Sequence, residues 1–339
     1  MSDIFVVDDM HVAKYFKFSV PGTVIVRGGS TFFLFMTLLM ACVDTISAKQ
    51  VLNGFAIGNA SVPAGRILSG GPPRDGIPSL NRPEMITADT ASYLRPKDAV
   101  LGISYRGVAK AYPNRILVWH EIVNDVFDGI PVLITFCPLC NTGMAFLRRV
   151  DGRDLDFGVS GLLYNSDMLM YDRRTESLWS QIPGEAISGE YKGRKLIQLP
   201  VVHTTWEDWR NQHPDTLALS TDTGYRRDYT SNPYGGYEES TALYFPMLRR
   251  DRRYHPKEKV LGLQLDGTAR AWPFSELEKT SGEIHDRFGG RPVTIRFSKQ
   301  HQSARAVGED GALLPAVTAY WFAWYSFFPY TEVFKAGYE

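Results

Sequence analysis

The sequence predicts an α+β fold that is predominantly β, with two related hairpin-helix-hairpin subdomains from an internal duplication. Residues 100–113 (VLGISYRGVAKAYP) alternate around Arg106-Gly107, which is typical of a β-hairpin. Residues 260–273 (VLGLQLDGTARAWP) repeat this pattern 160 residues later. Residues 127–132 and 288–293 also match, at an offset of 161 residues. Self-similarity at a nearly constant offset indicates a duplicated unit, so we expect two related subdomains that share one core.

The elements of the first copy follow from its turn residues. A short helix over residues 114–119 is expected after the first hairpin. Residues 121–136 then form a second hairpin, because Asp128-Gly129 lies at their middle and favours a tight turn. This order places His120 at the junction of helix and strand. It places Cys137 at the end of the closing strand.

Between the two copies, the pattern predicts more strands and one helix. Residues 155–187 alternate apolar and polar side chains, as strands do. A helix is expected to begin near Thr204 or Thr205, either of which can cap it. Residues 222–237 (DTGYRRDYTSNPYGGY) are rich in Gly, Pro and Tyr and predict a long loop.

These elements give an expected organisation of five segments. In chain order they are a signal peptide or membrane anchor (1–48), an irregular N-terminal segment (49–95), the first repeat with the CPLC motif and the strands after it (96–200), a connecting helix with the Tyr- and Gly-rich loop (201–258), and the second repeat with a C-terminal segment (259–339).

Residues 31–43 (TFFLFMTLLMACV) are apolar, follow Arg27, and are too short to span a bilayer comfortably. They are typical of the apolar region of a signal peptide. Cleavage after Ala48, a lipoprotein box that ends at Cys42, and an uncleaved anchor all remain open, and so does a buried core helix. We expect an exported protein that is periplasmic or extracytoplasmic, with attachment to the membrane through this segment as one alternative.

The composition excludes some classes of protein. Apolar residues make up 44% and charged residues 22%, which is ordinary for a globular protein. Lys+Arg and Asp+Glu both number 37, so the charge gives no reason to expect nucleic acid as a partner. Phosphate-loop, dinucleotide-binding and Gly-x-Ser-x-Gly motifs are absent from the sequence. The partner, the substrate and the existence of a catalysed reaction are left open.

The motif Cys137-Pro138-Leu139-Cys140 holds the only cysteines outside the apolar leader. An exported protein rarely keeps an idle thiol pair in an oxidising compartment. Thiolates and imidazoles together suit zinc or copper, and we favour copper slightly. His120 is the first candidate for a nitrogen ligand, because its hairpin delivers Cys137, and His203 is the second. Either histidine can instead be an ordinary core or surface residue.

The second copy serves as an internal control for this motif. At the matching offset it has Ser298, His301 and Ser281 in place of Cys137, Cys140 and His120. The scaffold therefore does not require the cysteines.

Two other functions remain open. The first is thiol-disulfide exchange by the Cys-x-x-Cys pair, although the pair does not open a helix as it does in thioredoxin-like folds. The second is a non-catalytic partner-binding module that a disulfide stiffens. Several polar and aromatic residues could line a pocket, or could simply form turns and core: Glu121, Asn165, Asp167, Asp172, Trp179 and Tyr234.

Long motifs occur in one order from about Arg66 to the C-terminus: ILSGGPPRDGIPSL, AYPNRILVWHEIVND, TFCPLCNTGMAF, FGVSGLLYNSDMLMYDRRTESLWSQ, VHTTWEDW and AYWFAWYSFFPYTEV. In these motifs the chain resembles the DUF3179 family of bacterial and archaeal proteins, which often carry an export signal. The resemblance implies export but no activity, because the family has none assigned. Phe328 stands where similar sequences lead us to expect histidine, so a site that used that position would be altered here.

Overall fold

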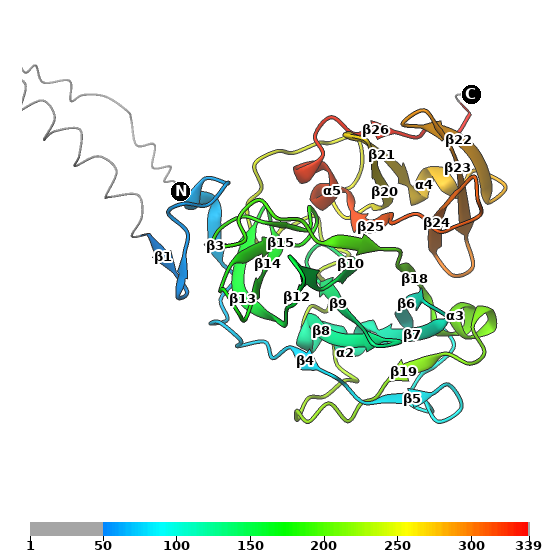
Figure 1. The fold of residues 1–339 in the computed structure, drawn as a ribbon. Helices are drawn as coiled ribbons and strands as arrows, with labels where there is room; N and C mark the ends of the chain where they lie inside the picture. The colour runs from blue at the N-terminus through cyan, green and yellow to red at the C-terminus, as the bar shows by residue number, and fades with distance from the viewer. Residues whose placement is uncertain (1–49, 338–339) are drawn as a thin grey trace, which may run out of the picture. The chain divides into compact units, whose positions relative to one another are not determined.

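The computed structural model describes residues 50–337 (Figure 1). The expected signal peptide or anchor over residues 1–48 lies outside this range. In residues 50–337, no helix is both long enough and apolar enough to cross a membrane. The same range is built from small sheets, most of whose strand pairs are antiparallel, and from four short α-helices.

The first five-stranded sheet contains the hairpin around Arg106-Gly107. Both turn residues have positive φ angles, 51° and 79°, which match the right-handed twist of the flanking strands. A strand from much later in the chain pairs with this hairpin at one side. In the order β18-β6-β7-β19-β5, the strands are β18 (Val202–Thr205), β6 (Ala99–Tyr105), β7 (Val108–Pro113), β19 (Leu217–Leu219) and β5 (Met85–Thr87).

The second five-stranded sheet carries the two cysteines at the turn between its strands β9 and β10. In the order β17-β10-β9-β8-β4, its strands are β17 (Ile197–Leu199), β10 (Thr142–Leu147), β9 (Ile130–Cys137), β8 (Ile122–Phe127) and β4 (Leu80–Asn81).

The third five-stranded sheet is formed by strands between residues 67 and 186. In the order β16-β15-β14-β13-β3, its strands are β16 (Glu185–Ala186), β15 (Leu178–Ser180), β14 (Asp167–Asp172), β13 (Phe157–Tyr164) and β3 (Ile67–Ser69). Two-stranded ribbons accompany these sheets: β1 (Val51–Leu52) with β2 (Phe55–Ala56), and β11 (Arg149–Val150) with β12 (Arg153–Asp154).

The C-terminal part forms a four-stranded and a three-stranded sheet. The first has the order β25 (Val317–Tyr320), β20 (Lys259–Leu265), β21 (Thr268–Pro273) and β26 (Glu332–Val333). The second has the order β22 (Glu283–Phe288), β23 (Arg291–Ser298) and β24 (Ser303–Gly308).

The α-helices are short, and each begins directly after a strand. Thr205 begins one of them, because its hydroxyl oxygen accepts a hydrogen bond from the Asp208 amide at 3.3 Å. The α-helices are α2 (Asn114–His120), α3 (Trp206–Gln212), α4 (Phe274–Leu277) and α5 (Trp321–Phe327), and a 3-10 helix, η2, spans Ala64–Arg66.

The predicted α+β class with two hairpin-helix-hairpin subdomains is wrong. The five larger sheets of residues 50–337 form a five-bladed, β-propeller-like arrangement, and the helices form no layer of their own (Figure 1). The hairpins are not the centres of separate subdomains, because each is widened by strands from distant segments. Strand β18 joins β6, and strand β19 joins β7 in parallel. The prediction failed because local patterns do not reveal such long-range pairing.

A pattern of strand pairing does recur in the fold. Strands β25 and β26 flank the β20–β21 hairpin in the same order and directions as β18 and β19 flank β6–β7. Gly102 and Gly262 occupy matching positions in β6 and β20. A Cβ atom at Gly102 would lie 2.1 Å from the ring of Trp209, and one at Gly262 would lie 2.3 Å from the ring of Trp324. Both glycines therefore make room for an indole of the helix that follows the flanking strand.

Residues 220–258 connect β19 to β20 without any helix or strand. A connection of this length in a compact domain is usually functional or disordered. This one is held from inside, because the buried Lys257 ammonium donates hydrogen bonds to the carbonyls of Tyr237, Ser240 and Ala242. These bonds join one buried side chain of the segment, here called the covering loop, to three of its own carbonyls.

Candidate metal centre

The CPLC motif forms the tight connection between β9 and β10. Cys137 ends β9 and pairs with Thr142 at the start of β10, and the Cys140 amide donates to the Cys137 carbonyl at 3.2 Å. Asn141 has a φ of 52°, a left-handed conformation that asparagine tolerates better than most residues. Both thiols are free and buried, with exposed fractions of 2% and 0%.

A second hairpin turn, Asn165-Ser166 between β13 and β14, brings a carboxylate to the cysteines. Both residues have positive φ angles, 53° and 63°. The turn is buried because polar groups of the covering loop satisfy it: the Leu248 amide donates to Asn165 Oδ1 at 3.1 Å, and Ser166 Oγ donates to the Phe245 carbonyl at 2.7 Å. Asp167 follows the turn directly, so its position is fixed.

Cys137, Cys140 and Asp167 form the candidate centre, because their ligand atoms all lie within 4.8 Å of one another. The Cys140 thiol donates to the Ser166 carbonyl at 3.2 Å. One carboxylate oxygen of Asp167, Oδ2, accepts a hydrogen bond from the Ile182 amide at 3.1 Å. The other, Oδ1, is buried with no hydrogen-bond partner among the described residues. Such an unpaired buried oxygen is costly unless a ligand compensates it.

The acidic groups of this region all have raised pKa values. Burial raises the pKa of Asp167 to about 7, although the Ile182 amide opposes the shift. Burial also raises the pKa of the Cys137 thiol and, much further, that of Cys140. Glu121, fully enclosed beside them, has a pKa raised to about 8 by burial and by the charge of Asp167. A bound cation would reverse these shifts, because it stabilises thiolates and carboxylates.

Glu121 is held in an unusual conformation at the end of α2. Its φ is 57° and its ψ is −30°, a region that non-glycine residues rarely adopt. Its carbonyl accepts a hydrogen bond from the Phe136 amide at 2.8 Å. In the recurring part of the fold, Gly282 takes this position, with a φ of 97° and a matching bond from the Phe297 amide at 2.7 Å. The backbone here suits glycine, so the side chain of Glu121 is retained at a conformational cost.

The structure does not bring the two predicted histidine ligands into this group. His120 Nδ1 lies 2.8 Å from the Pro78 carbonyl, and His120 Nε2 lies 2.7 Å from the hydroxyl of Tyr229. His203 lies beside β10, with Nε2 3.1 Å from the carbonyl and 3.2 Å from the amide nitrogen of Gly143. Both rings make hydrogen bonds within the fold. His120 thereby attaches the covering loop to α2, through Tyr229.

The predicted pocket residues divide into two groups. Glu121 and Tyr234 lie near the candidate centre, and the Tyr234 hydroxyl donates to Glu121 Oε1 at 3.4 Å. Asp172 and Trp179 instead belong to a turn and to the core, because the Asp172 carboxylate accepts hydrogen bonds from Thr175 and from the Trp179 indole at 3.0 Å. Asn165 orients the turn before Asp167.

Asp167 was expected as a pocket residue and not as a ligand. The sequence indicated a ligand only weakly. Asp167 is a single acidic residue that follows a polar turn and precedes the apolar residues Met168, Leu169 and Met170. Glu121 also gave a weak indication of a functional residue, because Gly282 stands at the corresponding position of the second copy.

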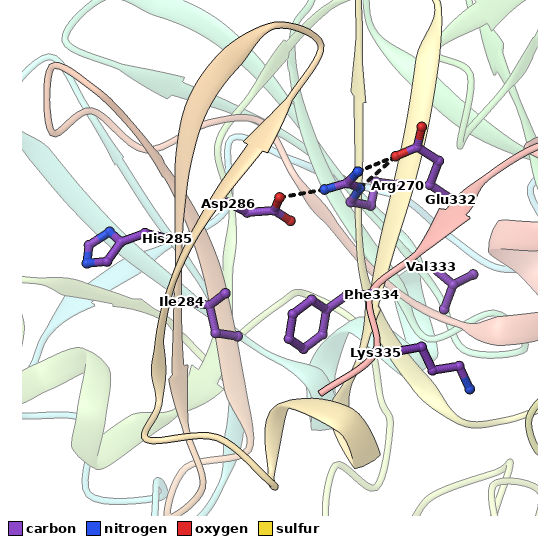
Figure 2. Close-up of a pocket in the computed structure, with 8 residues that line it drawn as sticks. All are labelled: Arg270, Ile284, His285, Asp286, Glu332, Val333, Phe334 and Lys335. Carbon is purple, nitrogen blue, oxygen red and sulfur yellow. Dashed lines mark hydrogen bonds and ion pairs between the residues drawn. The ribbon is translucent and has the colours of Figure 1, made fainter. Parts of the chain in front are cut away.

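Larger grooves lie elsewhere among the described residues, and one of them holds an ion-pair network. The groove drawn in Figure 2, about 630 Å³ in volume, has Arg270 between Asp286 and Glu332. The recurring pattern contains the same kind of network, since Lys110 pairs with Asp125 at 2.9 Å. A charge pair present in both parts belongs to the scaffold, so we assign no ligand to this groove.

Residues 74–313 match the model of a family described as proteins of unknown function, DUF3179. The chain belongs to the DUF3179 family. Comparison with curated proteins and with solved structures gives no match. Family membership therefore assigns no activity, and the centre has to be judged by its own chemistry.

Proposed function

We propose that this DUF3179 protein binds a metal ion through Cys137, Cys140 and Asp167, with zinc favoured over copper. Zinc accepts thiolate sulfur and carboxylate oxygen in one tetrahedral site. Copper(I) prefers sulfur, and carboxylates suit harder ions. The slight preference for copper drawn from the sequence depended on a histidine ligand. A carboxylate in its place moves the preference to zinc.

One observation carries this proposal: Asp167 Oδ1 is fully buried beside two thiols and has no hydrogen-bond partner among the described residues. A buried carboxylate oxygen without a partner loses its solvation, and hydrogen bonding of the carboxylate to the Cys137 and Cys140 thiols, which lowers the Asp167 pKa, offsets the effect of burial only in part. A metal ion would compensate this oxygen and the two sulfur atoms together. Three protein ligands would leave one coordination position for water or a substrate, as in catalytic zinc sites.

Thiol-disulfide exchange is supported less well. A reactive cysteine needs a lowered thiol pKa and access to solvent. Burial instead raises the pKa values of both Cys137 and Cys140. The pair also lies between two strands, where no helix N-terminus stabilises a thiolate. A role as a partner-binding module stiffened by a disulfide is the third alternative.

Export is proposed on the sequence alone, from the apolar residues 31–43 that follow Arg27. The periplasmic or extracytoplasmic location and the attachment to a membrane are part of the same proposal. Comparing the molecular mass of the protein from the cell envelope with that of the full chain would test it. A full-length product confined to the cytoplasm would refute it.

The metal site is tested with full-length protein and its variants, loaded separately with zinc and with copper(I). Elemental analysis should find one zinc per chain in the wild type and at least tenfold weaker zinc binding in Asp167→Asn and in Cys140→Ser. The controls are His120→Gln and His203→Gln, which should keep zinc. Zinc lost with a histidine would return the site to the set expected from the sequence. A metal-free protein with a reducible disulfide would favour exchange, and an inert disulfide would favour the binding module.

A further inference from the structure

A small cavity adjoins the candidate metal centre and is not explained by packing alone. Its volume is about 220 Å³, and its lining includes Glu121, Leu139 and Met168. Leu139 stands between the two cysteines in sequence, and Met168 follows Asp167. Cys137, Cys140 and Asp167 are not in the lining, but both cysteines pack in the same core cluster as Leu139 and Met168, which are, so the cavity lies next to the centre.

The size and lining of this cavity define what it can hold. An engineered apolar cavity of about 150 Å³ binds benzene, so a space somewhat larger takes roughly ten non-hydrogen atoms. Its walls are apolar apart from a few groups, and Glu121 is the one lining residue with a carboxyl group. A ligand that fits would have an apolar body and a single polar head.

The covering loop forms the outer wall of the cavity. It contributes Tyr234, Tyr244 and Phe245 to the lining. Tyr244 is 59% exposed, so this wall lies at the protein surface, and the cavity is partly open to solvent. The inner part of the same loop packs with the centre, because Tyr237 belongs to the buried core cluster that contains Cys137 and Cys140.

Glu121 gives the cavity its polar end. The conformation that it adopts has a steric cost for a non-glycine residue. Gly282 avoids this cost at the matching position. Packing does not account for the difference, because Glu121 lines an open space next to Asp167.

We propose that this cavity is the ligand pocket of the metal centre, and that it takes a small apolar molecule with one metal-binding head group, such as a thiol. The apolar body occupies the space beneath the covering loop. The head passes Glu121 and fills the coordination position that the three protein ligands leave free. This inference rests on the proposed metal site.

Cobalt(II) in full-length protein provides the test, because its visible absorption reports the ligands around it. Phenylmethanethiol should change the spectrum and bind at least tenfold more tightly than methanethiol, which has the same head without the body. Toluene, which has the body without the head, should compete with phenylmethanethiol. Equal affinities for the two thiols, with cobalt bound, would refute the pocket.

Two variants place the ligand in this cavity. Ile77→Trp fills the lining from a half-buried loop position, and should weaken phenylmethanethiol binding at least tenfold with cobalt content unchanged. Ile197→Trp is the matched control, since Ile197 is 64% exposed and is not in the lining. Phe245→Ala should enlarge the cavity and admit diphenylmethanethiol.

The outcomes separate the two proposals. Wild-type protein that binds no cobalt would refute the metal site itself, and the pocket with it. Cobalt bound in full, with Ile77→Trp and Ile197→Trp giving the same thiol affinity, would refute only the pocket.

Discussion

The burial of His203 predicts that the folded protein loses stability in acid. Its ring is buried next to β10, and burial lowers its pKa from 6.5 to about 4. The carbonyl of Gly143 opposes this shift, and the charge of Lys259 adds to it. The folded protein therefore keeps this imidazole neutral at pH values where the unfolded chain already binds a proton.

The sign and size of the effect follow from proton linkage. The contribution of His203 is complete above pH 6.5 and is lost as the pH falls toward 4, because the unfolded chain then takes up the proton first. Each unit of pKa difference corresponds to 1.36 kcal/mol, so the loss reaches about 3 kcal/mol. His203→Gln keeps an amide that can bond Gly143 and removes the titration.

Urea denaturation between pH 7.5 and 4, with a chelator present to remove any metal, measures this loss. The wild type should lose about 3 kcal/mol more stability over this range than His203→Gln does. Carboxylates that titrate in both proteins cancel in the difference. Parallel stability profiles for the two proteins would show that His203 is not buried as described.

Two further substitutions, each with a control, test the packing at Gly102 and the buried ion pair of Lys110. Gly102→Ala should destabilise the protein by about 1–3 kcal/mol and lower its melting temperature, because the added Cβ would overlap the indole packed on β6. Gly65→Ala is the control and should change the melting temperature little, because the space around its Cβ is open. Lys110→Met should cost about 3–5 kcal/mol in denaturant titrations, because it leaves the buried Asp125 without its cation. Arg106→Met breaks an exposed ion pair and should cost less than about 1 kcal/mol; equal losses from both substitutions would contradict the burial of the Lys110 pair.

Local features of the fold could be predicted from the sequence, and its long-range features could not. The turns at Arg106-Gly107 and Asp128-Gly129 were readable because glycine readily adopts the positive φ angle that the second turn position requires. The pairing of β18 with β6 joins segments that no local pattern connects. The fold class was missed for that reason.

The candidate centre shows the same division. Cys137 and Cys140 are close in sequence, so their meeting in space could be expected from one turn. Asp167 meets them only because the Asn165-Ser166 turn is buried under the covering loop. His120 was expected as a ligand because its hairpin delivers Cys137, but imidazoles can equally serve as hydrogen-bonding core groups, as His120 and His203 do here.

The chain between β10 and β17 has a consequence for how such a centre could have arisen. In the C-terminal part, β24 is followed within a few residues by β25, whereas β10 is followed by the whole β13–β14 hairpin before β17. Exchanging Ser298 and His301 for cysteines would copy the sulfur pair there in two substitutions. The hairpin that carries Asp167 has no counterpart between β24 and β25, so no residue of the C-terminal part corresponds to this carboxylate. Two thiols alone would therefore not reproduce the candidate centre, which also needs the segment that carries Asp167.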